Sequence, residues 1–342
     1  METQKEGENS LKYRMNATAI CGKSDLRIRD FEVSEARGRE VVIKVMSCGV
    51  CPTSIPIIEN PDRPHPHRGA LNYVGVPGLP GHEVAGEIVD VGEEVSEFQV
   101  GERVVPILCR NGFAQYFKSS ELGYVRIPEG VEFDEACFAE PLACCLSGQL
   151  KFQIKPGDDV LVIGAGQIGL LHMQLAKASG ARVIVSDQID GRLRFAEKMG
   201  AMETINPLKE NAEERISELT DGKLADAVIV AAASKTAIEQ GLRMVAFRGN
   251  FHIFAAIWPA VKIETDPNII HYNETVITAS YACDEGTRID LFRRALKLIK
   301  LGIVNTGDLV THRLPLEKTY KAHMMIKSRE GFKVIIKPWM KT

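Results

Sequence analysis

Residues 160–169 hold the feature that most constrains the fold, a glycine-rich turn between an apolar run and a helical pattern. The apolar run ends at Gly164, and the helical pattern continues past Gly169. In such a turn Gly164 permits a tight bend, Gly166 lets the backbone approach a pyrophosphate, and Gly169 lets the helix pack closely on the strand. Because a helix N-terminus also offers free N–H groups to phosphates, the turn predicts a dinucleotide-binding site.

The segments around this turn alternate between strand and helix patterns, which predicts right-handed βαβ units and a parallel sheet. The predicted strands are residues 160–163, 182–186, 225–230 and 250–255, with a last strand near residue 278. The predicted helices are residues 170–179, 191–199, 236–245 and 288–301. Two short strands are predicted near residues 309–312 and 332–336.

The second strand ends at Asp187, which is 18 residues past Gly169. About 20 residues is the expected spacing for the carboxylate that binds the adenosine ribose hydroxyls, so NAD is predicted over NADP. Arg192 and Arg194 follow closely in the sequence and would weaken the preference for NAD, because an arginine can accommodate the 2′-phosphate of NADP. The alternative is a turn that is glycine-rich without binding a ligand. The candidate cofactor-binding residues are Gly164, Ala165, Gly166, Gln167, Ile168, Gly169, Asp187 and Arg192.

Residues 1 to about 149 read as mostly β, because glycine and proline punctuate short apolar runs with weak helical periodicity. The predicted strands there are residues 41–46, 87–91 and 103–107. A proline- and histidine-rich loop spans residues 60–80, and loops of this length are often functional. His65 and His67 in this loop are expected near the substrate entrance rather than on a metal.

The composition is that of a globular protein with one or two domains: 342 residues, 45% hydrophobic and 25% charged. A net charge of −3 gives no field that would draw the chain to nucleic acid or to an anionic membrane. No apolar run approaches a membrane span of roughly 20 residues, and the polar N-terminus lacks the apolar core of a signal peptide. The eight cysteines are scattered, so the sequence predicts a cytoplasmic, reducing location.

Cys51, His82 and a glutamate supply the donor types of a catalytic zinc, which takes three protein ligands and keeps one position open. Cys48 and Cys51 form a CxxC pair, but no second pair follows to complete a structural site of four thiolates. A redox role is the alternative for this pair. Redox pairs normally open a helix in a thioredoxin-like unit, and Pro52 with a flanking strand fits that poorly. The remaining cysteines and histidines are predicted to be ordinary core or surface residues.

Three motifs, at residues 81–92, 140–145 and 162–169, resemble the medium-chain dehydrogenase/reductase superfamily. The first reads Gly-His-Glu-Val-Ala-Gly-Glu-Ile-Val-Asp-Val-Gly and is very specific to that superfamily. The second reads Glu-Pro-Leu-Ala-Cys-Cys and is similar to the sorbitol and threonine dehydrogenase side of its zinc-dependent alcohol and polyol branch. In that branch a glutamate replaces the second cysteine ligand of the liver-type alcohol dehydrogenases. The resemblance covers nearly the whole chain.

The resemblance implies an α/β protein with two domains. Residues 1–149 and 285–342 would form a GroES-like, mostly-β catalytic domain. Residues 150–284 would form a Rossmann NAD-binding domain with a doubly wound parallel sheet. The active site would lie in the cleft between the two domains.

The resemblance also implies the roles of the site residues. Cys51 would be the thiolate ligand and His82 the imidazole ligand of one catalytic zinc. Glu83 and Glu140 would be the carboxylates that complete the shell, directly or through water. Thr53 would be the hydroxyl that relays the substrate proton.

The chain departs from the family pattern in four places. The lobe that holds a structural zinc is missing, because residues 104–109 lead straight to residues 111–116. One zinc per subunit is therefore predicted. Ser54 stands where an aspartate usually orients the ligand histidine, and Pro56 stands where a histidine often ends the proton relay. Ser147 occupies another common histidine position.

The leading hypothesis is a zinc-dependent oxidoreductase that transfers a hydride between a secondary alcohol and NAD. The substrate would be a small alcohol or ketone, of the polyol, sugar or cyclitol class. One alternative is a zinc-free, NADPH-dependent quinone or enoyl reductase of the same superfamily. Another is a catalytically idle nucleotide-binding protein. A homodimer or homotetramer is expected, since soluble enzymes of this type usually form closed symmetric assemblies.

Overall fold

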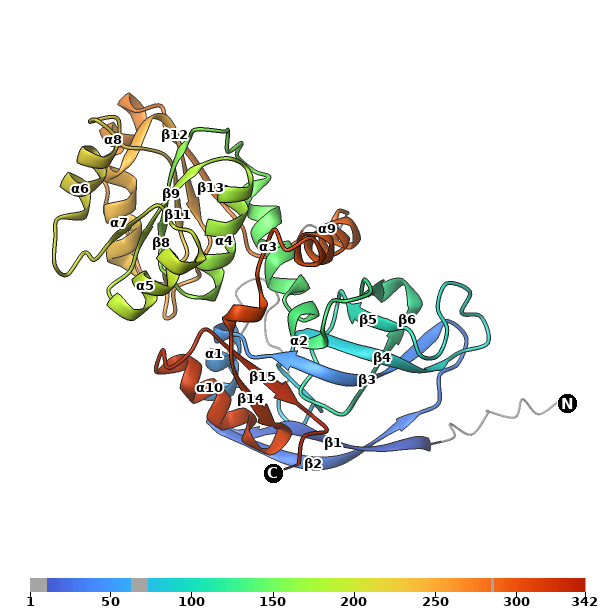
Figure 1. Ribbon diagram of the computed structural model, residues 1–342. Coiled ribbons are helices and arrows are strands. Elements are labelled where there is room, and N and C mark those ends of the chain that lie inside the picture. Colours follow the sequence, from blue (N-terminus) through green and yellow to red (C-terminus); the bar gives the residue numbers. More distant parts are fainter. Residues whose placement is uncertain (1–10, 63–72, 284–285, 342) are drawn as a thin grey trace, which may run out of the picture. The chain divides into compact units, whose positions relative to one another are not determined.

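The computed structural model describes residues 11–62, 73–283 and 286–341 (Figure 1). His65 and His67 lie outside these described residues. The chain divides into two compact units, one formed by Met1–Glu140 with Thr306–Thr342 and the other by Pro141–Asn305. Among the helices of the described residues, none is long and apolar enough to cross a membrane.

The domain boundaries expected from the sequence lie after residue 149 and before residue 285. The two compact units instead divide between residues 140 and 141 and between residues 305 and 306. The segment up to Asn305 joins the second unit because it is tied to a helix there. Gln174 accepts the backbone N–H of Asn305 at 2.7 Å and donates to its carbonyl oxygen at 3.3 Å. The helix α9 (Arg288–Lys300) in this segment also buries Leu291 and Phe292.

The first unit is built on a seven-stranded sheet and a separate two-stranded ribbon. The sheet runs in the order β14-β15-β3-β4-β5-β7, and β6 pairs with β3. Its strands are β3 (Glu40–Gly49), β4 (Glu83–Val91), β5 (Arg103–Pro106), β6 (Tyr116–Ser120), β7 (Tyr124–Arg126), β14 (Val310–Pro315) and β15 (Lys333–Lys337). The ribbon pairs β1 (Leu11–Gly22) with β2 (Asp25–Ser34) in antiparallel fashion. The helices are α1 (Ile55–Glu59), α2 (Phe133–Ala136) and α10 (Thr319–Lys327), with short 3₁₀ turns η1 (Pro52–Ser54), η2 (Glu121–Gly123), η3 (Gly307–Leu309) and η4 (Leu316–Lys318).

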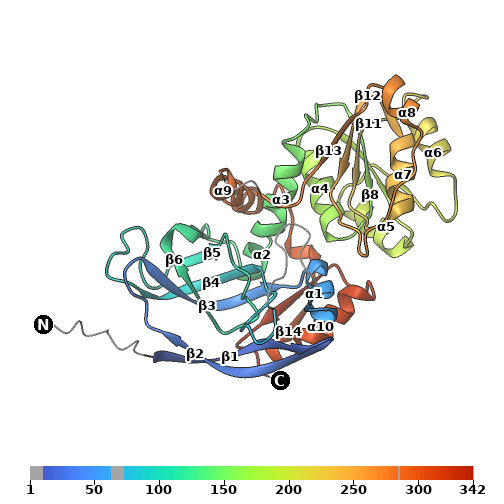
Figure 2. The same ribbon diagram turned by 180° about the vertical axis from the view of Figure 1, so that it is seen from behind.

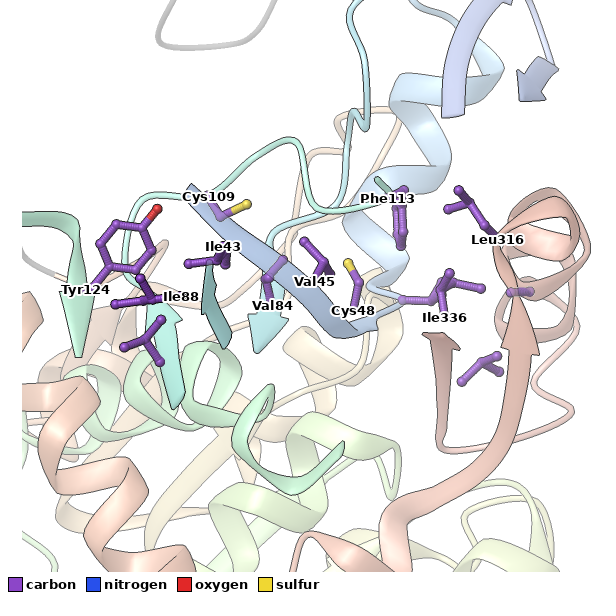
Figure 3. Close-up of a cluster of buried hydrophobic side chains, with 14 of the residues drawn as sticks. Ile43, Val45, Cys48, Val84, Ile88, Cys109, Phe113, Tyr124, Leu316 and Ile336 are labelled. Atoms are coloured by element: carbon purple, nitrogen blue, oxygen red, sulfur yellow. The ribbon is translucent and has the colours of Figure 1, made fainter. Parts of the chain in front are cut away.

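The core of this unit joins the two ends of the chain. Ile43, Val45 and Val84 from β3 and β4 are fully buried in one cluster with Leu316 and Ile336 (Figure 3). β3 contributes more residues to this cluster than any other strand, because it lies inside the sheet, between β4 and β15. Burial of this apolar surface is the main stabilising contribution, and it requires the C-terminal strand β15 to pair with β3. That pairing also brings β15 beside the end of β3, where the site described below begins.

The second unit is a six-stranded parallel sheet in the order β10-β9-β8-β11-β12-β13. Its strands are β8 (Asp159–Ile163), β9 (Arg182–Ser186), β10 (Glu203–Ile205), β11 (Ala225–Val230), β12 (Val245–Ile253) and β13 (Val276–Ala279). Its helices are α4 (Gln167–Ala178), α5 (Asp190–Met199), α6 (Ala212–Leu219), α7 (Lys235–Arg243), α8 (Pro267–Tyr272) and α9. α4 lies on one face of the sheet, and α6 and α7 lie on the other (Figures 1 and 2). The predicted doubly wound α/β fold is confirmed.

Buried parallel strands read as continuous apolar runs, which is why β8, β9 and β11 are visible in the sequence. Two of the predicted boundaries that are wrong lie next to each other, at the end of α7 and the start of β12. The helix predicted to reach Val245 ends at Arg243, and β12 begins at Val245 rather than at Asn250. The reason is an irregularity that interrupts the strand pattern: Arg248 has a φ of +59°, and the pairing register shifts beside it.

Helix α3 (Ala139–Gln149) is the longest helix that sequence reasoning missed, since that region reads as mostly β. Its first turn contains Glu140 and Pro141. A proline is compatible with the first turn of a helix, because the N–H groups there have no partner within the helix. α3 matters because it carries the candidate carboxylate Glu140.

Candidate metal and cofactor sites

The candidate metal site begins where β3 and β4 pair. Their antiparallel register places Gly49 opposite Glu83, the first residue of β4. Cys51 lies just beyond the end of β3, and His82 lies just before the start of β4. The two strand ends therefore bring residues 31 positions apart (82 − 51) to the same place. One donor atom each from Cys51, His82 and Glu83 lies within 4.8 Å of the other two, which is the only such group of three among the described residues.

The His82 ring is oriented by a backbone carbonyl. Its Nδ1 lies 2.9 Å from the carbonyl oxygen of Pro80, which can only accept, so Nδ1 carries the proton. In the neutral ring Nε2 then carries the free lone pair, which is the tautomer that a metal ligand needs. Ser54, which replaces the expected aspartate, has its Oγ 3.5 Å from the same carbonyl oxygen. Pro80 therefore supplies the acceptor that the sequence lacks at position 54.

The pKa of His82 shows that this group of side chains is suited to a cation. Burial alone would lower that pKa, but the charge and the hydrogen bond of Cys51, with further contributions from Glu140 and Glu83, raise it to about 10. The anionic donors thus attract positive charge to the point between them. A divalent cation supplies this charge more fully than a proton and pairs with the soft thiolate and the imidazole. The residues present fit a zinc ion.

Glu83 has a second partner deep in the first unit. Its carboxylate forms an ion pair with the ammonium group of Lys333, and the two side chains are 1% and 0% exposed. Burial alone would lower the pKa of Lys333, but the charge of Glu83 raises it, so Lys333 stays protonated. Lys333 also lies over the Phe138 ring at 5.2 Å. Sequence reasoning missed Lys333, and the only local signal was a lysine at the start of an apolar strand.

Gly49 makes room for this ion pair. A Cβ atom at Gly49 would lie 2.2 Å from Oε2 of Glu83 and 3.1 Å from Nζ of Lys333. Real Cβ atoms do not approach other atoms so closely, so any other residue at position 49 would displace the carboxylate. Gly49 was also missed from the sequence, where it reads as an ordinary glycine in a CGVC run.

The other predicted site residues surround this group. Thr53, in η1, donates from its hydroxyl to the Cys51 sulfur at 3.1 Å. Glu140, in the first turn of α3, lies outside the group of three donors but contributes to the raised pKa of His82. Pro56 lies in α1 and Ser147 is buried in α3.

Three other cysteines of this unit are not candidate ligands. Cys48, Cys109 and Cys137 are fully or almost fully buried. Burial raises the pKa of the Cys109 thiol to about 12 and raises the pKa of Cys48 and of Cys137 further above the usual range. Such thiols stay protonated and act as small apolar side chains.

The glycine turn of the second unit has the geometry of a dinucleotide cradle. Gly164 adopts a φ of +108°, which favours glycine. A Cβ atom at Gly169 would lie 1.7 Å from the carbonyl oxygen of Gly164, so only glycine lets α4 approach β8 this closely. At Gly166, the N-cap of α4, a Cβ atom would meet only Nη1 of Arg192, at 3.7 Å. The backbone is therefore open there, next to a guanidinium group that can pair with phosphate.

Asp187 and Gln167 point to the same ligand. The carboxylate of Asp187 accepts the backbone N–H of Ala165 at 2.8 Å and that of Ile189 at 2.9 Å. These bonds hold Asp187 at the carboxyl end of β9, and each oxygen keeps a lone pair for a ribose hydroxyl. The side-chain amide nitrogen of Gln167, at the start of α4, is buried without a hydrogen-bond partner. Ile168 follows it in α4, so the predicted cofactor residues cluster at one strand-helix turn.

The chain matches two family models. Residues 37–145 match the alcohol dehydrogenase GroES-like domain, and residues 168–300 match the zinc-binding dehydrogenase model. A sorbitol dehydrogenase of Halalkalibacterium halodurans is 31% identical over 87% of this chain and 92% of its own length. An L-threonine 3-dehydrogenase of Bacillus subtilis is 31% identical over 91% of this chain and 94% of its own.

Solved structures show the same fold. The 2R,3R-butanediol dehydrogenase of Bacillus subtilis is 26% identical, with a TM-score of 0.82 over 95% of this chain and 99% of that one. A putative zinc-binding dehydrogenase of Sinorhizobium meliloti, bound to NADP, is 26% identical, with a TM-score of 0.83 over 96% of this chain and 100% of that one.

Proposed function

The chain belongs to the zinc-type alcohol and polyol dehydrogenases of the medium-chain dehydrogenase/reductase superfamily, and we propose that it oxidises a secondary alcohol with NAD. The proposed substrate is a polyol, sugar or cyclitol, in keeping with relatives named for sorbitol and butanediol. The single observation that carries the proposal is the group formed by Cys51, His82 and Glu83, whose donor atoms lie within 4.8 Å of one another.

The proposed mechanism assigns each side chain a task. When bound, zinc supplies a Lewis acid for the alcohol oxygen, and the nicotinamide accepts the hydride. Cys51 and His82 would hold the metal, with Glu83 and Glu140 as the carboxylates that would complete the shell, directly or through water. Thr53, whose hydroxyl lies 3.1 Å from the Cys51 sulfur, accepts the substrate proton and passes it on.

The cofactor proposal rests on Asp187. A carboxylate held at the end of β9 favours the ribose hydroxyls of NAD and repels the 2′-phosphate of NADP. Arg192, near Gly166, is the feature that favours NADP, and one relative of known structure binds NADP. Parallel measurement of KM for NAD and for NADP decides the preference.

We also propose a homodimer or homotetramer in a reducing, cytoplasmic location. β13 forms one edge of its sheet, and two of its side chains, Val276 and Ile277, are 49% and 44% exposed. An exposed apolar edge strand is a ready surface for another copy of the chain. Among the described residues the cysteines form no disulfide, as expected of a reducing compartment. Light scattering after gel filtration tests the assembly.

The test of the function is a panel of polyols, cyclitols and amino alcohols, assayed by NADH absorbance with and without added zinc. The proposal predicts zinc-dependent NADH formation with at least one secondary alcohol. Cofactor binding without turnover across the panel would instead favour an idle nucleotide-binding protein, a reading that Pro56 in place of a relay histidine supports. Full turnover in metal-free protein would favour the zinc-free reductase.

A further inference from the structure

One face of helix α3 packs against the end of β13 and the segment that follows it. Lys151, just past the helix end, donates from Nζ to the carbonyl oxygen of Ala279 at 2.6 Å. One turn earlier, Gly148 lies against Ser280, since a Cβ atom at Gly148 would come within 2.9 Å of the Ser280 Oγ. The helix and the segment that follows β13 therefore run in opposite directions beside each other.

Two cysteine side chains meet where α3 packs against this segment. Cys144 lies four residues before Gly148, on the same face of α3, and its sulfur lies 3.9 Å from the sulfur of Cys283. Arg288 holds the Cys283 end in place by donating from Nη2 to the Cys283 carbonyl oxygen at 3.1 Å. Both sulfurs thus face each other from backbones that are fixed on either side. A disulfide needs about 2 Å between the sulfurs, which rotation of the two side chains can supply.

The pair is covered but lies close to the surface. The exposed fractions are 8% for Cys144 and 6% for Cys283. β13 is the edge strand of the sheet, and Tyr281, between it and Cys283, is 70% exposed. Because Cys283 lies in the segment after this edge strand, a local opening of that segment exposes its thiol to solvent without unfolding of the sheet.

We propose that Cys144 and Cys283 form a reversible disulfide when the protein meets a peroxide. One thiolate attacks a peroxide oxygen, the O–O bond breaks, and a sulfenic acid and one water form. The second thiol attacks the sulfenic sulfur, the S–S bond forms, and a second water leaves. Two thiols lose two electrons and two protons in total, and hydrogen peroxide is reduced to two waters. A dithiol reductant reverses the step.

The disulfide links residues that are 139 positions apart in the chain. It anchors α3 to the segment beyond the edge strand and restricts the unfolded chain, so the oxidised protein should melt roughly 5 °C or more above the reduced protein. The proposal concerns the second unit alone and does not depend on the proposed dehydrogenase activity.

The test uses the full-length, zinc-loaded protein treated with hydrogen peroxide, alkylated, and digested with trypsin without reduction. The expected product joins the peptide of residues 127–151 to the peptide of residues 263–288, with a mass lower by two hydrogens than the sum. It should disappear after treatment with dithiothreitol, and the rise in melting temperature should disappear with it.

Variants identify the sulfurs. Cys144→Ser and Cys283→Ser should each abolish the linked peptides and the rise in melting temperature. Cys145→Ser, next in sequence and fully buried, should keep both, as should Cys21→Ser. The proposal is overturned if the wild-type protein yields no linked peptides under conditions that oxidise Cys21, or if the link survives in Cys144→Ser. The first of these outcomes needs no variant, so misfolding of a variant cannot mask it.

Discussion

Replacement of Lys333 by methionine tests the idea that a buried cation balances Glu83 behind the metal ligands. Lys333 and Glu83 are 0% and 1% exposed, so water does not screen their charges. Removal of one partner from a buried ion pair leaves the other charge without compensation, and Lys333→Met should lower the free energy of unfolding by about 3–5 kcal/mol. Methionine fills a similar volume, so the loss reports the charge rather than a cavity.

The assay is urea unfolding of the metal-free protein, followed by circular dichroism at pH 7.5. The double variant Glu83→Gln/Lys333→Met should recover much of the loss, because no unpaired charge remains. Lys327→Met, which removes an ion pair with Glu59 at the surface of the same unit, should leave the unfolding midpoint unchanged. A decrease in the free energy of unfolding below about 1 kcal/mol in Lys333→Met would show that Lys333 does not balance a buried charge. A decrease in the double variant as large as in Lys333→Met would show the same.

The remaining predictions concern the site and its pH dependence. The pKa of Lys333 is raised above 10.5, so the protonated lysine should stabilise the fold fully below pH 10.5. Above that pH Lys333 should lose its proton, and the stability contributed by the ion pair should be lost with it. An alkaline unfolding transition that is present in the wild-type protein and missing in Lys333→Met would confirm this. Cys51→Ser should lose zinc, measured by elemental analysis, and turnover together, and full activity without metal would contradict the assigned site. Thr53→Val should keep zinc but lower kcat roughly 10²–10⁴-fold, so an unchanged kcat would remove Thr53 from the proton relay. Asp187→Ser should raise KM for NAD roughly tenfold, through the loss of about one charge-assisted hydrogen bond, and should lower KM for NADP, because the carboxylate that repels the 2′-phosphate is gone; equal shifts for both cofactors would count against a ribose contact.

The sequence predicts the second unit well because its signals are local. The conformation of an apolar strand such as β8, or of a turn such as Gly164 to Gly169, is determined by a few neighbouring residues. The parallel sheet and the family assignment are both confirmed. The end of α7 was misplaced because Arg248, with its positive φ, breaks the apolar pattern of the following strand.

The surroundings of the candidate metal ligands were less predictable because they depend on contacts distant in the chain. Lys333 meets Glu83 across 250 positions, and no pattern near either residue indicates the other. The acceptor for His82 is a backbone carbonyl, at Pro80, so no side chain could have indicated it. Glu140 was identified by its motif, yet the helix that carries it was missed, because a Glu-Pro step reads as loop when tertiary packing is unknown.

The most direct test of the proposed zinc site is anomalous diffraction at the zinc absorption edge, from crystals of the protein grown with zinc and NAD. We expect one anomalous peak per subunit, about 2.3 Å from the Cys51 sulfur and about 2.1 Å from Nε2 of His82. A zinc-loaded crystal with no peak at these two atoms, or with its peak on other residues, would contradict it.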